Sequence, residues 1–289
     1  MKNNQQEFYP VALTIAGSDS GGGAGIQADL RTFNAFGVFG TTAITAITSQ
    51  NPAAVTRVDL LDPAAVTAQL SAIFAKLAVS AAKCGMLGNS AMILAVADFL
   101  KKHRQLHLVV DPVMVSTSGA KLLDDDAVSV MKQELLPLAD IITPNIPEAE
   151  LLTGRKLATF DDFVQAAIEM AEQYRAMIIL KGGHSIEDKE YAVDIAVRDG
   201  KIYELISPRV DIAEYTDHGT GCTFSAALTA AHAIGLGWKE TLTAAKGFVL
   251  GSLAEAVEIG PKLQAMYPPL ESYETKTDLQ QLKIPGTGK

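Results

Sequence analysis

The sequence is poor in cysteine and carries fewer basic than acidic residues. Of its 289 residues only two are cysteine, Cys84 and Cys222, too few for a disulfide framework and typical of a reducing cytoplasm. Lys and Arg total 24 against 33 Asp and Glu, a formal net charge of −9. A surface this acidic argues against a nucleic-acid or anionic-membrane partner, although one local pocket could still bind a small anion.

Signal-peptide and membrane-span patterns are also missing. Residues 1–10 are polar and have no apolar core of the signal-peptide type. The stretch 218–238 lacks Asp, Glu, Lys and Arg, but its four glycines and two histidines indicate a buried helix with its loop. We therefore expect a cytoplasmic protein that does not bind membranes.

Two common nucleotide-binding motifs are absent or weak. The Gly-Lys pairs at 200–201 and 288–289 are not followed by Ser or Thr, which excludes a Walker A loop. Residues 23–28 match the spacing G-x-G-x-x-A, but the next expected strand, 41–48, ends without an acidic residue to bind a ribose. We therefore reject a dinucleotide-binding fold.

Short apolar runs alternate with amphipathic runs along the chain. This alternation predicts a three-layer α/β fold, with a mainly parallel central sheet and helices on both faces. Two strands joined by Asp199-Gly200 predict a hairpin that adds antiparallel edge strands. We see no repeat or linker, so we expect one domain over 1–289, with a core of about 11–257 and a loose tail at 268–289. The expected strands are 11–16, 41–48, 81–84, 106–111, 141–143, 177–181, 192–197 and 202–206, and the expected helices are 26–36, 63–75, 91–102, 125–135, 160–173, 222–233 and 239–257.

Polar or glycine-containing clusters directly follow six of the expected strands. In such a fold the carboxyl ends of the parallel strands share one edge, where ligands bind. Structural loops would scatter their unusual residues over both edges, so this pattern favours an active site. The clusters are 17–19, 49–51, 85–87, 111–113, 143–145 and 181–184.

The segment Gly219-Thr220-Gly221-Cys222 stands at the start of a long expected helix. Its glycines allow successive N–H groups to face one point, and the helix dipole adds positive charge, so the segment can form an anion hole. It could equally separate two elements. The position predicts a lowered pKa for the Cys222 thiol, which would then accept a proton from an attacking hydroxyl, whereas most free cysteines are only packed. The glycines at 21–25 similarly indicate either a tight turn or a flexible wall beside a substrate.

Four polar residues at the same edge have two interpretations each. Lys181 either extends to the surface or contacts a phosphate. Asn145 and Glu148 lie three apart in the first turn of an expected helix, where they either cap it or hold a hydrated Mg²⁺. Asp111, before Pro112, either forms a turn or supplies a second carboxylate for the metal.

Seven ordered motifs give the chain a family resemblance. The sequence resembles the hydroxymethylpyrimidine and phosphomethylpyrimidine kinases of thiamine biosynthesis, in the ribokinase-like superfamily, over about 11–257. The motifs are AGSDSGGGAGIQADL (16–30), ITSQN (47–51), KCGML (83–87), VVDPVM (109–114), TPNIPEAELLTG (143–154), LKGGH (180–184) and HGTGCTFSAAL (218–228).

The resemblance implies a reaction and a role for each motif residue. It implies ATP-dependent phosphorylation of a hydroxymethylpyrimidine and then of its monophosphate, with Mg²⁺, in a protein that forms a homodimer. Cys222 corresponds to the cysteine near the reacting hydroxyl group, where the wider superfamily has an aspartate base, and Gly219, Thr220 and Gly221 correspond to the anion hole. The implied substrate contacts are Gly17, Ala24, Gln50, Met86 and Val113, the ATP contacts are Lys181, Asn145 and Thr143, and the metal contacts are Glu148 and Asp111.

Two rival functions remain open. Pyridoxal kinase is the nearest, because pyridoxal is also a small flat ring with a hydroxymethyl group. Gln50, whose amide can donate to and accept from an aminopyrimidine edge, favours the pyrimidine. The other rival is a non-catalytic nucleotide-binding regulator, and the intact set of Lys181, Glu148, Asp111 and 219–222 speaks against it.

Overall fold

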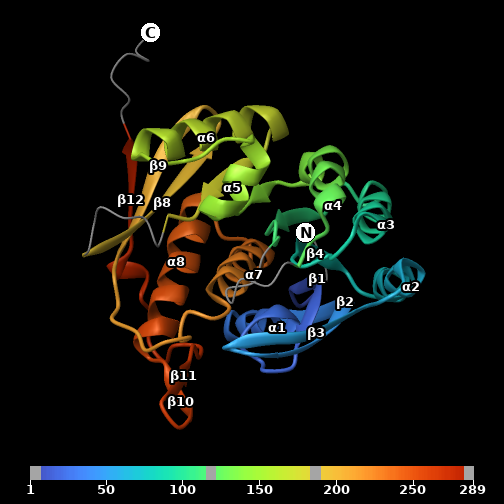
Figure 1. Cartoon of the computed structure of the whole chain (residues 1–289), viewed down its shortest axis with the longest axis horizontal. Helices are drawn as coiled ribbons and strands as arrows, with labels where there is room; N and C mark the ends of the chain where they lie inside the picture. The colour runs from blue at the N-terminus through green and yellow to red at the C-terminus, as the bar shows by residue number, and fades with distance from the viewer. Residues whose placement is uncertain (1–7, 115–121, 183–189, 283–289) are drawn as a thin grey trace, which may run out of the picture.

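The chain is built around one large sheet (Figure 1). The computed structural model describes residues 8–114, 122–182 and 190–282, and within them ten strands pair in the order β12-β9-β8-β7-β6-β5-β4-β1-β2-β3. The strands β2, β1, β4, β5, β6 and β7 run parallel, so the predicted mainly parallel centre is confirmed. The ten are β1 (Val11–Asp19), β2 (Phe39–Asn51), β3 (Ala54–Leu60), β4 (Val79–Cys84), β5 (His107–Val110), β6 (Ile141–Ile142), β7 (Met177–Leu180), β8 (Tyr191–Arg198), β9 (Lys201–Pro208) and β12 (Asp278–Leu282).

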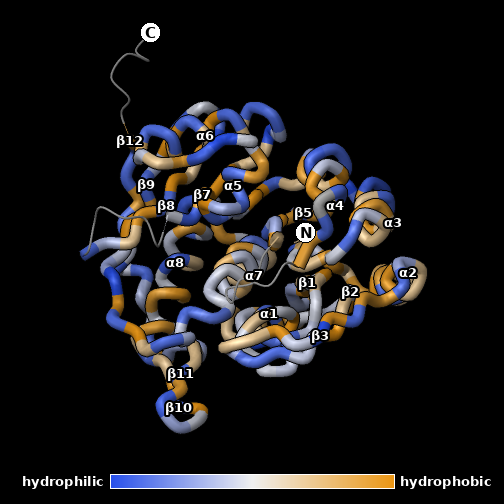
Figure 2. Tube along the Cα trace, viewed as in Figure 1, coloured by the Kyte–Doolittle hydropathy of each residue, from blue (hydrophilic) through white to orange (hydrophobic). Residues whose placement is uncertain are grey.

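Helices cover both faces of the sheet. Alternation along each strand separates two cores: Val110 and Ile178 pack in one cluster, while their neighbours Val109 and Ile179 pack in the other. Figure 2 shows the hydrophobic residues running along the central strands. The helices α2 (Pro63–Phe74), α3 (Ser90–Leu100), α4 (Asp125–Val130), α5 (Ile146–Thr153) and α6 (Phe160–Tyr174) lie on one face, and α1 (Gly25–Ala35), α7 (Thr220–Ala233) and α8 (Trp238–Ala254) on the other. Short helical turns follow at Met131–Leu135, Leu136–Leu138 and Glu274–Lys276.

The antiparallel strands at the sheet ends differ partly from expectation. The predicted hairpin is present as β8 and β9. The tail expected to be loose contributes β12, which pairs with β9, so that prediction is wrong for 278–282. Three of the five residues of β12 are polar, so the sequence there does not show the hydrophobic pattern that indicates a strand. The sequence analysis also did not predict β3, which pairs with β2, or the small hairpin of β10 (Val257–Gly260) and β11 (Leu263–Ala265). The last long helix ends at Ala254 rather than at Val257. A single domain for the whole chain stays a prediction.

Local sequence signals explain where several helices begin. Asp62 accepts a hydrogen bond from the Ala64 amide, and Pro63 occupies the first turn of α2, as predicted. α7 packs on β1, β4 and β5, which brings its first turn to the carboxyl edge of the sheet. Among the described residues, no helix is both long and apolar enough to cross a bilayer.

Candidate active site

Three side chains directly after β5, β6 and β7, together with one in the first turn of α5, form what we call the phosphate side: Asp111, Thr143, Lys181 and Glu148. Lys181 Nζ lies 2.9 Å from Asp111 Oδ1, and Thr143 Oγ1 donates to the same oxygen at 3.2 Å. Burial opposes the charge on each partner, but Asp111 raises the pKa of Lys181 and Lys181 lowers that of Asp111. The result is a buried ion pair whose lysine keeps 18% of its side chain exposed and can meet a ligand.

The first turn of α7 lies directly against this ion pair. A Cβ built on Gly221 would stand 3.2 Å from Lys181 Nζ and 3.6 Å from Asp111 Oδ2. Gly219 has a φ of +88°, and a side chain there would overlap the carbonyl oxygen of Gly23. The first amides of a helix lack acceptors within it, so this turn presents N–H groups beside an ammonium, as an anion site requires.

One amide of the predicted anion hole has a partner within the chain. The Thr220 N–H donates to the Asp217 carbonyl at 3.1 Å. Gly219 starts the helix as its N-cap, and Gly221 and Cys222 belong to its first turn. The Gly221 and Cys222 amides therefore fit the role of anion donors better than the Thr220 amide does.

The Cys222 thiol differs from the prediction made for it. Burial raises its pKa to about 11, and the charges of Asp29 and Asp111 act in the same direction. The Lys83 ammonium and a hydrogen bond from the Gly25 backbone lower it, but not enough. The expected lowering of the Cys222 pKa is therefore wrong, because desolvation by burial outweighs the attraction of the Lys83 ammonium.

Asn145 and Glu148 form a capping box at the start of α5. Asn145 Oδ1 accepts from the Glu148 amide at 2.9 Å, and Glu148 Oε2 accepts from the Asn145 amide at 2.8 Å. The capping interpretation of Asn145 and Glu148 is therefore confirmed. Burial also raises the pKa of Glu148 to about 7, although the charge of Lys181 acts to lower it. A carboxyl group that titrates near neutral pH therefore lies beside the ion pair.

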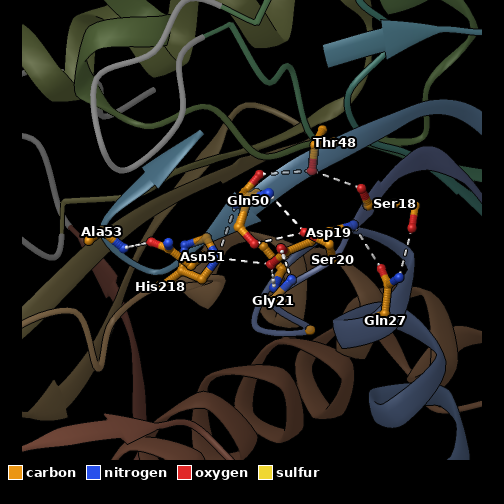
Figure 3. Close-up of polar contacts among 12 residues, drawn as sticks. Ser18, Asp19, Ser20, Gly21, Gln27, Thr48, Gln50, Asn51, Ala53 and His218 are labelled. Carbon is orange, nitrogen blue, oxygen red and sulfur yellow. Dashed lines mark hydrogen bonds and ion pairs between the residues drawn. The ribbon is translucent and has the colours of Figure 1, made fainter. Parts of the chain in front are cut away.

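Five residues in β1 and β2, after β4 and in the loop before α7 form what we call the acceptor side: Gly17, Asp19, Gln50, Met86 and His218. Gln50 Nε2 lies 3.1 Å from His218 Nε2, which in turn lies 3.0 Å from Asp19 Oδ2 (Figure 3). A Cβ on Gly17 would stand 3.2 Å from Met86 Sδ. Three predicted substrate contacts, Gly17, Met86 and Gln50, thus come to the same edge of the sheet as Lys181.

The other two predicted substrate contacts are placed less closely. Ala24 donates its amide to Asp19 Oδ2 at 2.8 Å and lies beside Gly219. Val113 follows β5 at the same edge and is half-buried. Of the motif at 180–184, the last two residues, including His184, lie outside the described residues.

Several residues of this region were not singled out from the sequence. Asp19 holds the first glycine loop by accepting from the amides of Gly21 and Ala24. Ser225, one turn into α7, donates to Asp111 Oδ2 at 3.3 Å. Lys83 is fully buried behind the site, and its signal was a lone lysine among small residues in a core strand.

The three-layer fold, with an ammonium and a helix start at the carboxyl edge of its sheet, defines a phosphotransferase of the ribokinase-like class. The chain belongs to the phosphomethylpyrimidine kinase family, whose profile matches residues 19–267. It is 47% identical over 250 residues to the hydroxymethylpyrimidine/phosphomethylpyrimidine kinase of Haemophilus influenzae, covering 86% of this chain and 92% of that relative.

Solved structures agree with this class. The phosphomethylpyrimidine kinase of Clostridium difficile aligns with a TM-score of 0.72 and 40% identity, over 83% of this chain and 97% of that one. The pyridoxal kinase of Staphylococcus aureus in complex with ADP aligns with a TM-score of 0.85 and 30% identity, over 96% of this chain and 100% of that one. The fold is thus shared with both a phosphomethylpyrimidine kinase and a pyridoxal kinase.

Proposed function

We propose that this protein uses ATP to phosphorylate 4-amino-5-hydroxymethyl-2-methylpyrimidine, and then the resulting monophosphate, in thiamine biosynthesis. One observation carries the proposal: the Lys181–Asp111 ion pair lies against Gly221 at the start of α7, beside the acceptor side. Identity to the Haemophilus influenzae kinase supports the choice of substrate.

The transfer itself needs positioning and charge neutralisation more than covalent chemistry. In our proposal, Lys181 and the amides of Gly221 and Cys222 bind the terminal phosphoryl group of ATP, with Thr143 and Asn145 on the ATP side. The substrate hydroxyl oxygen bonds to phosphorus while the bond from phosphorus to the ADP oxygen breaks. The sulfur of Cys222, whose pKa is raised to about 11, orients the hydroxyl group and accepts its proton only in the thiolate form. From the thiol form the hydroxyl proton passes to water, and the negative charge leaves with ADP.

A Mg²⁺ ion fits the oxygen donors of the phosphate side. Asp111 and Glu148 offer two carboxylates, and Mg²⁺ beside a nucleotide typically takes one or two carboxylates together with phosphate oxygens and water. Among the residues that the structure describes, no three His, Cys, Asp or Glu side chains are grouped to hold a metal. Asp111 and Glu148 would therefore hold the ion jointly with ATP and water, and the ion would supply charge neutralisation.

In our proposal, the pyrimidine binds on the acceptor side. Gly17 and Ala24 leave room for a flat ring, Met86 and Val113 contact it, and the Gln50 amide pairs with its polar edge. His218 already contacts the Gln50 amide nitrogen. The protein is further proposed to act in the cytoplasm as a homodimer.

Pyridoxal phosphorylation is the second candidate, because the Staphylococcus aureus pyridoxal kinase shares the fold at a TM-score of 0.85. A coupled assay of ADP release tests both with hydroxymethylpyrimidine, its monophosphate and pyridoxal in parallel. We expect the highest kcat/KM for hydroxymethylpyrimidine and measurable turnover of the monophosphate. Preference for pyridoxal would replace the proposed function, and no ADP release with any acceptor would indicate a non-catalytic regulator.

A further inference from the structure

Lys83 is a fully buried cation that the reaction described above does not use. It lies on β4, where Ala82 and Cys84 face the core under α2 and α3, so that Lys83 faces α1 and α7. Its side chain and that of its partner Asp29 are both 0% exposed, so Lys83 cannot touch a ligand from solvent. Burying an ion pair has a large desolvation cost, and an apolar pair of similar size would pack as well or better. The lysine therefore points to a role other than stability.

Lys83 joins three elements of the site. Its Nζ lies 2.7 Å from Asp29 Oδ1 on α1, and Thr14 Oγ1 on β1 donates to the other Asp29 oxygen at 2.6 Å. The same Nζ donates to the Cys222 carbonyl oxygen at 3.4 Å. The buried ammonium thus contacts the first turn of α7 from within the core.

The charges around the Cys222 sulfur come from four elements. Lys83 on β4 and Lys181 after β7 are cations, while Asp29 on α1 and Asp111 after β5 are carboxylates. Lys181 and Asp111 are paired with each other and face the phosphate side. Lys83 is the cation that acts most strongly against the burial of the thiol.

We propose that Lys83 is a positioning residue that fixes the first turn of α7 through the Cys222 carbonyl, and that its positive charge favours the thiolate form of Cys222, the form that can accept the substrate proton. Asp29 and Thr14 hold the ammonium in place. The proposal rests on the proposed function for its reaction step, but its effect on the thiol exists without any substrate. Lys83 acts through Cys222 and touches no reacting atom.

Alkylation of Cys222 by iodoacetamide tests the proposal without turnover. Cys84 is fully buried whereas Cys222 is half-buried, and mass spectrometry of the peptides separates the two. In Lys83→Met we expect the alkylation rate of Cys222 at pH 8.5 to fall at least tenfold, as for a rise of about one unit in thiol pKa. We expect kcat to fall similarly, the KM for ATP to stay within a factor of two, and Lys83→Arg to restore part of both losses.

Lys83→Met leaves Asp29 buried without its cationic partner, and this variant could unfold. The double variant Lys83→Met/Asp29→Asn removes both charges and replaces the single variant in that case. The matched control is Lys246→Met/Asp194→Asn, a second buried Lys–Asp pair at 2.5 Å between α8 and β8. The control should leave the alkylation rate unchanged. Because the Asp29 charge raises the Cys222 pKa whereas Lys83 lowers it, the double variant is compared with Asp29→Asn alone. Equal alkylation of Cys222 in these two variants, or wild-type alkylation in a folded Lys83→Met, would overturn the proposal. If the Lys83 variants are alkylated more slowly but the wild-type protein phosphorylates no pyrimidine, the role of Lys83 stands and the proposed function is rejected.

Discussion

The two sides of the candidate site are built from different materials. The phosphate side is made of charged side chains from the ends of neighbouring parallel strands, and its central contact is the ion pair of Lys181 and Asp111. On the acceptor side, the contacts are mainly glycine backbone, a thioether and the amide of Gln50, with Asp19 and His218 behind them. Cys222 at the start of α7 lies between the two.

This difference separates two tasks. Charges held in a buried place act most strongly on the charge that develops during phosphoryl transfer. The neutral contacts of the acceptor side decide mainly which ring binds, since the strength of these contacts differs little between the ground state and the transition state. Changes on the phosphate side should therefore lower kcat, and changes on the acceptor side should raise KM.

The largest effect is expected for Lys181→Met. Loss of this ammonium removes a donor to the transferring phosphoryl group and leaves Asp111 unpaired, so we expect kcat to fall by about 10³. The measurement is steady-state ADP release, with circular dichroism to confirm folding. Lys156→Met, at a side chain that is 88% exposed, is the control and should keep wild-type kcat. A kcat within threefold of wild type in Lys181→Met would remove Lys181 from the phosphate side.

Cys222→Ala tests the residue between the two sides. Its loss should lower kcat by about 10², within the range of general-base contributions, and should leave the KM of the pyrimidine nearly unchanged. Cys84→Ala, at the other cysteine, is the matched control for the loss of a buried thiol. An unaltered kcat in purified Cys222→Ala would show that another group handles the proton.

Glu148→Gln should alter the pH dependence of both activity and stability. The folded pKa of about 7 lies above the ordinary 4.5, so the fold favours the protonated acid. Its contribution to stability is complete below about pH 4.5 and is lost as the pH rises through 7, up to about 3 kcal/mol. If the ionised form holds Mg²⁺, wild-type kcat should rise through the same range.

In Glu148→Gln we expect kcat to fall about tenfold and its rise near pH 7 to disappear. The free energy of unfolding, from urea titrations between pH 5 and 8, should also lose the matching decline. Glu150→Gln, at the carboxylate of α5 that pairs with the exposed Lys156, is the control. The same pH profile in Glu148→Gln and wild type would assign the titration to another group.

The smallest effect is expected for Gln50→Ala on the acceptor side. Removing its amide should raise the KM of hydroxymethylpyrimidine about tenfold, with kcat changed less than threefold. The KM of ATP in the same variant is the internal control. An unchanged pyrimidine KM would remove Gln50 from the substrate contacts, and a large loss of kcat would break the division between the two sides.

Much of this arrangement could be predicted from the sequence, because hydrophobic period and strand-end clusters are local signals. The parallel centre, the hairpin at Asp199-Gly200 and the cap at Asp62 were all predicted from short segments. The pKa of Cys222 could not be, because it depends on burial and on charges from Asp29 and Asp111, which only the packed fold brings near. β12 was missed for a related reason: its pairing with β9 is a long-range contact, and its own residues are mostly polar.

The close approach of Gly219 to Gly23 has a consequence for altering substrate choice. Two segments almost two hundred positions apart in the chain meet there backbone to backbone, so neither can be remodelled alone. An engineer who wished to admit a bulkier vitamin precursor would have to exchange both loops together, as one cassette.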